Sequence, residues 1–308
     1  MSLPNQNIPH VAVCLAAFNG VRYLQQQVDS ILDQMGVNTT LFVSVDRSTD
    51  GTEAWFSRLA ERDARLVLLP FGESFGGAAL NFFRMLREID FEAFDYVAYA
   101  DQDDIWLPGK LQRATQRMVQ VGADGYSSDI VAFWESGRSV YMKKCFPQRK
   151  WDYLFESAGP GCAFVINQKL AMSIQKLLQQ NRQASAGIGF HDWLTYAFAR
   201  AHGYLWVIDD YASLMYRQHG QNQIGANSGW AAFGTRARRV LNGWGLGQSR
   251  LIASLVGQAD HAFVRRWSGG SRVGLLAVAF QASHCRRKPL DRVWFALSCL
   301  ALAVIGWR

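Results

Sequence analysis

Cysteine is scarce in this chain, and no two cysteines stand at the spacing of a metal-binding or redox pair. The five cysteines are scattered from residue 14 to residue 299, without a Cys-x-x-Cys among them. Structural zinc sites and disulfide frameworks need cysteines at recurrent spacings. The sequence therefore argues against both, and we expect a protein that stays in the reducing cytoplasm.

Long apolar runs are also lacking. The run Val11–Ala17 has no basic stretch before it and stops at Phe18-Asn19-Gly20, which indicates a buried strand rather than a signal peptide. The longest run, Val293–Trp307, would span about 22 Å as a helix, whereas the hydrocarbon core of a bilayer is roughly 30 Å thick. We therefore expect no segment that crosses a membrane.

Acidic residues are nearly absent from the C-terminal part of the chain. Residues 226–308 hold twelve basic and two acidic side chains, whereas the first 225 residues hold 20 basic and 23 acidic ones. The formal net charge of +7 therefore belongs to the tail, and the body is mildly acidic. A basic surplus prompts nucleic acid or an anionic membrane as a partner, and here that partner would meet only one end of the chain.

Short apolar runs alternate with helix-like spacing through the first two hundred residues. This alternation predicts an α/β fold with a mostly parallel sheet and helices on both faces. The expected strands are Val11–Ala16, Leu41–Val45, Leu66–Leu69, Tyr96–Ala100, Tyr204–Ile208 and Ala212–Tyr216. Helix-like segments after Gly225 are expected at 231–241, 251–267 and 273–284.

Polar, acidic and glycine residues follow each of the first four expected strands. Ligands of open α/β sheets bind outside the carboxyl ends of the parallel strands, so a cleft is expected at this edge. The segments concerned are Phe18-Asn19-Gly20, Asp46-Arg47-Ser48-Thr49-Asp50-Gly51, Gly72-Glu73-Ser74-Phe75-Gly76-Gly77 and Asp101-Gln102-Asp103-Asp104.

Asp101, Asp103 and Asp104 are the sharpest feature of this edge. Three carboxylates within four residues repel one another unless a cation neutralises them. Hard oxygen ligands at this density suit Mg²⁺ or Mn²⁺. A solvated acidic loop that caps the next helix is the alternative, but the position after a buried strand and beside Trp106 favours the metal.

Three further groups stand at the ends of expected elements. Asp46 ends a strand, where its carboxylate is free to accept hydrogen bonds from a ligand. Asp192 begins a helix signal and serves either as the N-cap or as a general base. Residues 216–222, which include Arg217 and His219, form either a surface loop or a set of donors for a diphosphate.

Seven stretches in this order resemble the family 2 glycosyltransferases, which are inverting nucleotide-sugar enzymes with the GT-A fold. They are VAVCLAAFNGVRYLQQQVDSIL, SVDRSTDGT, FGGAALNF, YVAYADQDDIWLPGKL, GPGCAFVINQKLA, HDWLTYAFA and YRQHGQNQIGA, over residues 11–226. The motifs DQDDIW, HDW and YRQHGQN are most similar to bacterial rhamnosyltransferases that use dTDP-L-rhamnose to build lipopolysaccharide core or O-antigen. Where many members have Asp-Asp-Gly-Ser and Glu-Asp, this chain has Val45-Asp46-Arg47-Ser48 and His191-Asp192.

The resemblance implies where the nucleotide sugar binds. Asn19 and Asp46 would lie near the nucleotide, with Asp46 in contact with the base. Arg217 and His219 would close over the diphosphate, and His219 would also approach the metal.

The resemblance also implies a metal site and a catalytic base. Asp101 and Asp103 would be the Asp-x-Asp pair that holds Mg²⁺ or Mn²⁺ and the ribose–diphosphate. Asp104 would support that site or touch the sugar. Asp192 would take a proton from the acceptor hydroxyl as it attacks the anomeric carbon.

Taken together, these features predict a nucleotide-sugar glycosyltransferase domain over residues 1–225 and a basic, amphipathic helical tail over residues 226–308. The expected reaction moves L-rhamnose to a hydroxyl of a lipopolysaccharide core, O-antigen or other lipid-linked glycan. Apolar and arginine-rich helices are typical of a membrane interface, so we expect peripheral attachment to the cytoplasmic face of the bacterial inner membrane. Packing of the tail on the catalytic domain is the alternative.

Three other functions compete with this prediction. A family 2 transferase with a UDP-sugar donor is the nearest. A phosphatase of the haloacid-dehalogenase type is suggested by Asp101-Gln102-Asp103-Asp104, although its motif normally follows the first strand. A nucleic-acid-binding protein is suggested by the basic tail, but the acidic body would repel phosphate backbones, and we expect no nucleic-acid partner.

Overall fold

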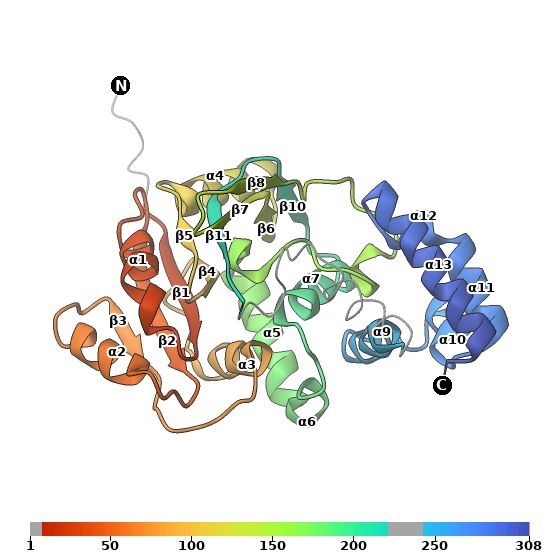
Figure 1. The fold of residues 1–308 in the computed structure, drawn as a ribbon, viewed down its shortest axis with the longest axis horizontal. Helices are drawn as coiled ribbons and strands as arrows, with labels where there is room; N and C mark the ends of the chain where they lie inside the picture. Colours follow the sequence, from red (N-terminus) through yellow and green to blue (C-terminus); the bar gives the residue numbers. More distant parts are fainter. Residues whose placement is uncertain (1–7, 221–242, 308) are drawn as a thin grey trace.

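A seven-stranded sheet forms the centre of the computed structural model, which describes residues 8–220 and 243–307 (Figure 1). Its strands are β1 (His10–Ala17), β2 (Asn38–Val45), β3 (Leu66–Leu68), β4 (Tyr96–Asp101), β6 (Gly125–Ser128), β9 (Val165–Asn167) and β10 (Trp206–Asp209). They lie in the order β10-β6-β9-β4-β1-β2-β3, with β9 antiparallel to both neighbours and the other pairs parallel. The mostly parallel sheet predicted from the sequence is confirmed.

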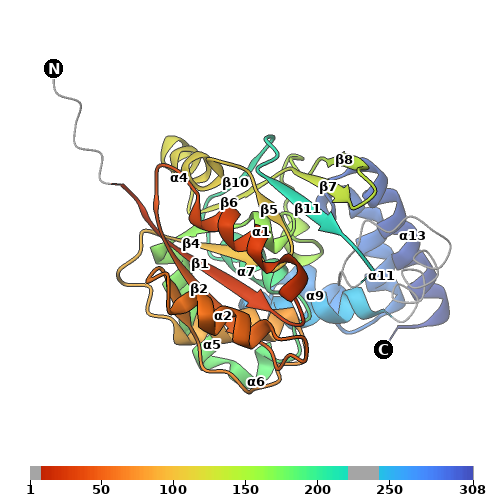
Figure 2. The same cartoon turned by 60° about the vertical axis from the view of Figure 1, so that its left-hand side comes forward.

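Helices cover both faces of this sheet, because successive side chains of a strand point to opposite sides. Val11 and Val13 of β1 belong to one hydrophobic core, and Ala12 and Cys14 belong to the other. The first core includes apolar side chains of α1 (Val21–Leu32), α2 (Thr52–Ala60) and α4 (Lys110–Val121). The second includes those of α3 (Ala78–Glu88), α5 (Gln168–Gln180) and α7 (His191–Ala201), and the short α6 (Arg182–Ser185) follows α5. Figure 2 looks onto the side of the sheet that α1 and α2 cover.

A smaller sheet joins distant parts of the chain beside the central one. Its strands are β5 (Ile105–Trp106), β7 (Ile130–Trp134), β8 (Ser139–Met142) and β11 (Leu214–Gln218), in the order β5-β11-β7-β8. β5 comes directly after Asp104, and β11 pairs with it antiparallel. This pairing returns residues 217–219 to the acidic segment at the end of β4. β7 and β8 lie where the sequence pattern is loose, and neither was predicted.

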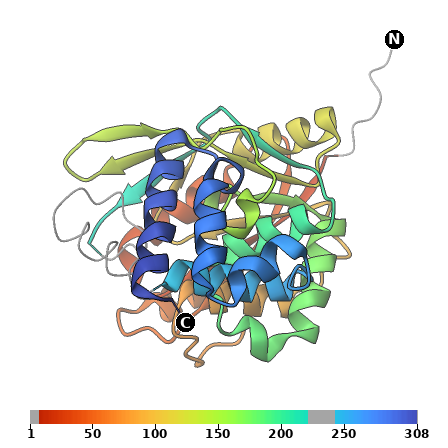
Figure 3. The same cartoon turned by 90° about the vertical axis from the view of Figure 1, so that its right-hand side faces the viewer.

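The described C-terminal residues form helices that share the second core with the body. They are α9 (Trp244–Leu255), α10 (Ala262–Ser268), α11 (Arg272–Phe280), α12 (Ala282–Cys285) and α13 (Pro289–Ile305). The Trp151 ring stacks on Phe263 with centroids 4.7 Å apart, and Trp267 is fully buried with its ring 5.3 Å from Phe155. Figure 3 shows α11 and α13 side by side at this end of the molecule.

Two C-terminal helix predictions are wrong, and the helix expected at 273–284 is divided into α11 and α12 at Gln281. The single helix expected at 251–267 is divided into α9 and α10, because the chain reverses through Gly257, whose φ of +73° favours glycine. The His261 side chain then accepts a hydrogen bond from the Phe263 amide and caps α10. The helix expected at 231–241 and the domain boundary expected after residue 225 lie outside the described residues.

The longest helix of this region, α13, has 17 residues. Within residues 8–220 and 243–307, no helix combines the length and the hydropathy that a membrane span requires.

Candidate active site

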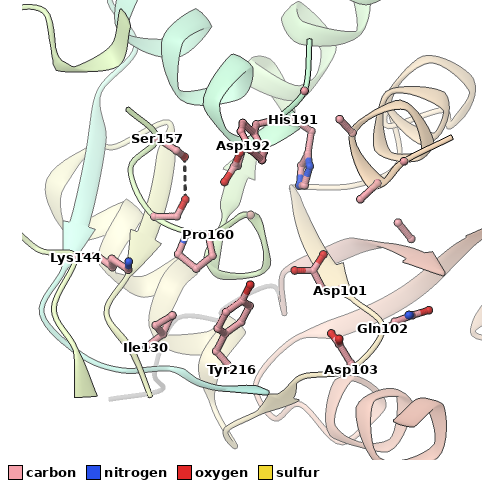
Figure 4. Close-up of a pocket in the computed structure, with 18 of the residues that line it drawn as sticks. Asp101, Gln102, Asp103, Ile130, Lys144, Ser157, Pro160, His191, Asp192 and Tyr216 are labelled. Atoms are coloured by element: carbon pink, nitrogen blue, oxygen red, sulfur yellow. Dashed lines mark hydrogen bonds between the residues drawn. The ribbon is translucent and has the colours of Figure 1, made fainter. Parts of the chain in front are cut away.

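A cleft of about 1310 Å³ opens at the carboxyl ends of β1, β2 and β4. Six of the eight side chains singled out from the sequence line it: Asn19, Asp46, Asp101, Asp103, Asp192 and His219. Figure 4 shows Asp101 and Asp192 pointing into the same space, one from the end of β4 and the other from the start of α7. The fold therefore gathers at one edge of the sheet residues that are far apart in the chain.

The carboxylates at the end of β4 are crowded. Burial, followed by the neighbouring charges of Asp103 and Asp192, raises the pKa of Asp101. Burial and the charges of Asp103 and Asp101 raise the pKa of Asp104 well above its ordinary value. A raised carboxyl pKa means that the charged form is disfavoured, and a bound cation would relieve that cost.

Arg217 and Asp104 are the two predicted site residues that do not line the cleft. Only 7% of Arg217 is exposed, and its Nε donates to the Asp103 carbonyl oxygen at 2.7 Å. Its Nη2 donates to Gln26 at 2.6 Å, and its amide donates to the fully buried Asp104 carboxylate at 3.1 Å. These hydrogen bonds tie the acidic segment after β4 to the end of β11, outside the lining of the cleft.

His219 reaches the cleft beside Asp103. Its Nε2 lies 2.6 Å from Asp103 Oδ2, and its ring stacks on Tyr23 with centroids 5.1 Å apart. The resemblance implies that His219 lies near the metal, but local sequence pattern does not show the pairing, because it depends on the return of β11 past β5. Asp101, Asp103 and His219 together offer two carboxylates and an imidazole to the cleft.

A second set of possible metal ligands lies deeper. One ligand atom each of Asp101, Asp104 and Cys162 lies within 4.8 Å of the others. Burial and the charges of Asp104 and Asp101 raise the pKa of the Cys162 thiol well above its ordinary value. A protonated thiol is a poor ligand for hard cations, which prefer oxygen. The thiol therefore makes this set a poor fit for Mg²⁺ or Mn²⁺, although its three ligand atoms lie close together.

Asn19 and Asp46 order the loops after β1 and β2, which line the same edge of the sheet as the carboxylates of β4. Asn19 has a φ of 45° and accepts a hydrogen bond from the Thr49 amide at 2.8 Å, which ties the loop after β1 to the loop after β2. The Asp46 carboxylate accepts hydrogen bonds from the amides of Phe75 and Gly76 at 3.0 and 3.2 Å. Asp46 thus fixes the glycine-rich segment before α3 against the end of β2.

Asp192 lies in the first turn of α7, where Phe190 is the N-cap residue. Its Oδ1 accepts a hydrogen bond from the Trp193 amide at 2.7 Å. Burial raises the pKa of Asp192 to about 6. The carboxylate is therefore ionised at neutral pH and more basic than an ordinary aspartate, as a general base requires.

His191 is a packing residue next to Asp192. Its ring stacks on Phe82 with centroids 3.8 Å apart, and burial lowers its pKa to about 3, so it is neutral at physiological pH. A Cβ atom at Gly161 would lie 2.3 Å from His191 Nε2. The absence of a side chain at Gly161 therefore leaves the room in which the start of α7 is seated.

The far half of the cleft is lined by basic residues that we did not identify as site residues. They are Lys143 and Lys144 after β8, and Arg286, Arg287 and Lys288 before α13. Arg286, Arg287 and Lys288 belong to the basic tail, for which the sequence predicts attachment to a membrane rather than a place in the cleft. Their position in the cleft follows from the packing of the C-terminal helices on the body.

Comparison with known proteins identifies relatives over most of the chain. The model of glycosyl transferase family 2 matches residues 12–189. The dTDP-rhamnosyl transferase RfbG of Shigella flexneri is 36% identical over 284 residues, which cover 92% of this chain and 98% of that protein.

Solved structures with low sequence identity share the fold. TarS 1–349 from S. aureus, in complex with UDP-GlcNAc, has a TM-score of 0.53 and 13% identity over 95% of this chain and 90% of its own. The mannosyltransferase PcManGT from Pyrobaculum calidifontis, in complex with GDP-Man and Mn²⁺, has a TM-score of 0.52 and 17% identity over 97% of this chain and 87% of its own. The expected GT-A-type fold is confirmed.

The two possible ligand sets predict different effects of substitution on cation binding. We expect Mn²⁺ to bind in isothermal titration calorimetry, and Asp103→Asn to weaken its affinity at least about tenfold because a charged ligand is lost. Cys162→Ser should leave the affinity within about twofold, since a hard cation does not need the thiol. Normal affinity in Asp103→Asn with weakened affinity in Cys162→Ser would assign the cation to the deeper set.

Proposed function

Because the chain belongs to glycosyl transferase family 2, we propose that it transfers L-rhamnose from dTDP-L-rhamnose to a hydroxyl group of a glycan, with inversion at the anomeric carbon. The observation that carries this proposal is the identity to a dTDP-rhamnosyl transferase along nearly the whole length of both chains. The acceptor class is a lipopolysaccharide core, an O-antigen or another lipid-linked glycan. Family membership removes the phosphatase and nucleic-acid-binding alternatives raised by the sequence.

Asp192 is proposed as the general base. The acceptor oxygen forms a bond to the anomeric carbon while the bond from that carbon to the diphosphate oxygen breaks. The acceptor proton passes to the Asp192 carboxylate, and the electron pair leaves with dTDP. General base catalysis contributes on the order of 10²–10⁴ in rate. One protein carboxylate suffices for the protons, unlike the pair that most glycosidases use.

Asp101, Asp103 and His219 would hold Mg²⁺ or Mn²⁺ in this cleft. When bound, the cation supplies Lewis-acid stabilisation of the charge that develops on the leaving diphosphate. Arg217 and Asp104 act as positioning residues, since their bonds to the backbone of residues 103 and 217 fix the segment that carries Asp103.

The nucleotide is proposed to bind at the Asn19–Asp46 end of the cleft. Both residues line it, and the loops that they tie together form its walls. Contact between Asp46 and the base remains part of this proposal. The bonds from Asp46 to the Phe75 and Gly76 amides add a second role, which is to shape the wall of the nucleotide pocket.

A donor panel tests the reaction. We expect the full chain with Mn²⁺ to release nucleoside diphosphate fastest from dTDP-L-rhamnose, and Asp192→Asn to lower kcat at least about 10²-fold because no base accepts the proton. Asp33→Asn, on the surface after α1, is the matched control and should keep full activity. Faster turnover of a UDP-sugar would replace the donor assignment, and full activity of Asp192→Asn would refute the base.

The pKa of Asp192 predicts a pH dependence. The ionised carboxylate is the active form, so kcat/KM should rise as the pH increases through about 6 and then level off. Rates measured from about pH 5 to about pH 8, with saturating Mn²⁺, check this. A profile that stays flat over that range would show that the ionisation of Asp192 does not control the reaction.

The C-terminal helices are proposed to attach the enzyme to the cytoplasmic face of the inner membrane. The side of these helices that belongs to the second hydrophobic core packs on the body. In contrast, Val273 and Phe280 of α11 are 76% and 86% exposed. These two residues are seven positions apart and share one helix face. An exposed apolar face with nearby arginines is typical of an interfacial helix. The proposal retains the expected division of labour, with chemistry in residues 1–225 and attachment in residues 226–308.

Vesicle binding tests this attachment. We expect the full chain to sediment with vesicles of phosphatidylglycerol and phosphatidylethanolamine, and the double variant Val273→Ser/Phe280→Ser to bind at least about tenfold more weakly, since apolar area no longer enters the interface. Val119→Ser is the matched control, because Val119 is 72% exposed on α4 of the body. Equal binding by the double variant and the control would contradict the assignment of this face.

A further inference from the structure

The cleft is divided into an acidic half and a basic half. Asp46, Asp101 and Asp103 line the first, and the five cations at 143–144 and 286–288, with the carboxylates of Glu156 and Asp291 among them, line the second. Figure 4 shows Lys144 on the opposite side of the cleft from Asp101 and Asp103, with Asp192 between the two groups. The proposed cation and nucleotide use only the acidic half. The basic half therefore remains available to a second ligand, on the side of Asp192 away from the nucleotide.

Two arginines of the basic half, the buried Arg287 and the half-buried Arg286, have nitrogen atoms without a hydrogen-bond acceptor among the described residues. Arg287 is 5% exposed, and its Nε lies 3.2 Å from Glu156 and 3.7 Å from Asp152. Its Nη2 donates to the Ser157 carbonyl oxygen, but Nη1 has no hydrogen-bond partner among the described residues. Arg286 donates through Nη1 to the Phe155 carbonyl oxygen, and its Nε likewise has none. Buried donors without acceptors are costly, and an anion would supply those acceptors.

The positive charges of Arg287 and Lys288 act on Lys144 in the basic half. Within the described residues, no carboxylate lies at ion-pair distance from Lys143, Lys144 or Lys288. Lys144 is half-buried, and burial followed by the charges of Arg287 and Lys288 lowers its pKa. Asp129 and Asp291 face Lys144 and offset only part of this effect. Lys144, Arg287 and Lys288 would all attract a phosphate bound here, and the phosphate would relieve the repulsion that Lys144 experiences.

An apolar groove continues from the basic half. Its volume is about 320 Å³, and Arg286 and Asp291 line both the groove and the cleft. The groove lies between α9 and α13, and its apolar lining includes Phe155, Trp193, Leu246, Trp294, Phe295 and Leu302. A ligand that passes from the cleft into this groove would leave a cluster of cations and enter a hydrocarbon-like surface. A cationic surface followed by an apolar groove fits an amphiphile with a phosphate head and an apolar chain.

We propose that the basic half and the groove bind the acceptor through its linkage: a phosphate or diphosphate at Lys144, Arg287 and Lys288, and the start of a hydrocarbon chain in the groove. The inference rests on the proposed function, because it assigns the acceptor of that reaction. The glycan attached to the phosphate would extend back toward Asp192, which places one of its hydroxyl groups beside the base. The C-terminal helices would then contribute to acceptor recognition as well as to membrane attachment.

Binding of a small amphiphile tests this subsite without knowledge of the glycan. The probe is farnesyl diphosphate, titrated below its micelle concentration into the full chain in EDTA, with inorganic pyrophosphate and farnesol as partial probes. We expect Lys144→Gln and Lys288→Gln each to weaken farnesyl diphosphate at least about tenfold, since each removes a charge from the phosphate site. Trp294→Ser, on the groove wall, should weaken farnesyl diphosphate and leave pyrophosphate unchanged.

One control variant and two further binding measurements test which anion the cations of the basic half bind. Lys176→Gln, on the exposed side of α5, should bind farnesyl diphosphate normally. Unchanged farnesyl diphosphate affinity in Lys144→Gln would overturn the proposal. So would a loss that appears only in binding to phosphatidylglycerol vesicles, because the cations would then serve a lipid headgroup. An equal loss of dTDP affinity in Mn²⁺ would overturn it as well, because the cations would then serve the donor.

The outcome is separable from that of the donor panel. If no nucleotide sugar is turned over while farnesyl diphosphate binding still depends on Lys144 and Trp294, the proposed reaction fails and the phosphate–hydrocarbon subsite stands. If dTDP-L-rhamnose is turned over and farnesyl diphosphate binds without Lys144, the reaction stands and the subsite is wrong.

Discussion

The crowding of carboxylates at the end of β4 is the constraint on which the rest of the site depends. Asp101 ends a central strand and Asp103 and Asp104 follow it directly, at a point where burial disfavours the charges of Asp101 and Asp104. Contacts with a distant strand stabilise this segment. β11 returns to pair with β5, and Arg217 forms hydrogen bonds to the backbone of residue 103 and to Asp104. Lys110 is buried over the Trp106 ring near Asp104, but burial lowers its pKa to about 7, so it offsets the charge of Asp104 only in part. The carboxylates that face the cleft remain available to a metal.

The same cleft is basic on its other side, and this gives the charge distribution of the sequence a structural meaning. The surplus of positive charge in the C-terminal region does not lie only on an outer surface, because residues 286–288 reach the cleft through the packing of α10–α13 on the body. Asp192 stands between the two halves. The proposed reaction needs this arrangement, in which a nucleotide diphosphate and an acceptor approach one carboxylate from opposite sides.

The sequence predicts the catalytic edge well because that edge depends on local pattern. Apolar runs give the first four strands, and the residues that follow each run are bound to lie at one edge of a parallel sheet. Contacts that depend on distant parts of the chain could not be predicted in this way. The pairing of His219 with Asp103 requires β11, and β8 is too exposed to show an alternating pattern. The division of the helix expected at 251–267 depends on the conformation of Gly257, and the cleft position of Arg287 depends on the packing of Trp151 against Phe263.

The central claim is that the acidic edge of the sheet holds a cation and a nucleotide diphosphate directly opposite Asp192. Anomalous diffraction from crystals grown with Mn²⁺ and dTDP tests it most directly. The account predicts one Mn²⁺ peak within bonding distance of Asp103, with the diphosphate between that peak and Asp192. A peak buried between Asp104 and Cys162, or a diphosphate bound at Lys144 and Arg287 instead, would contradict it.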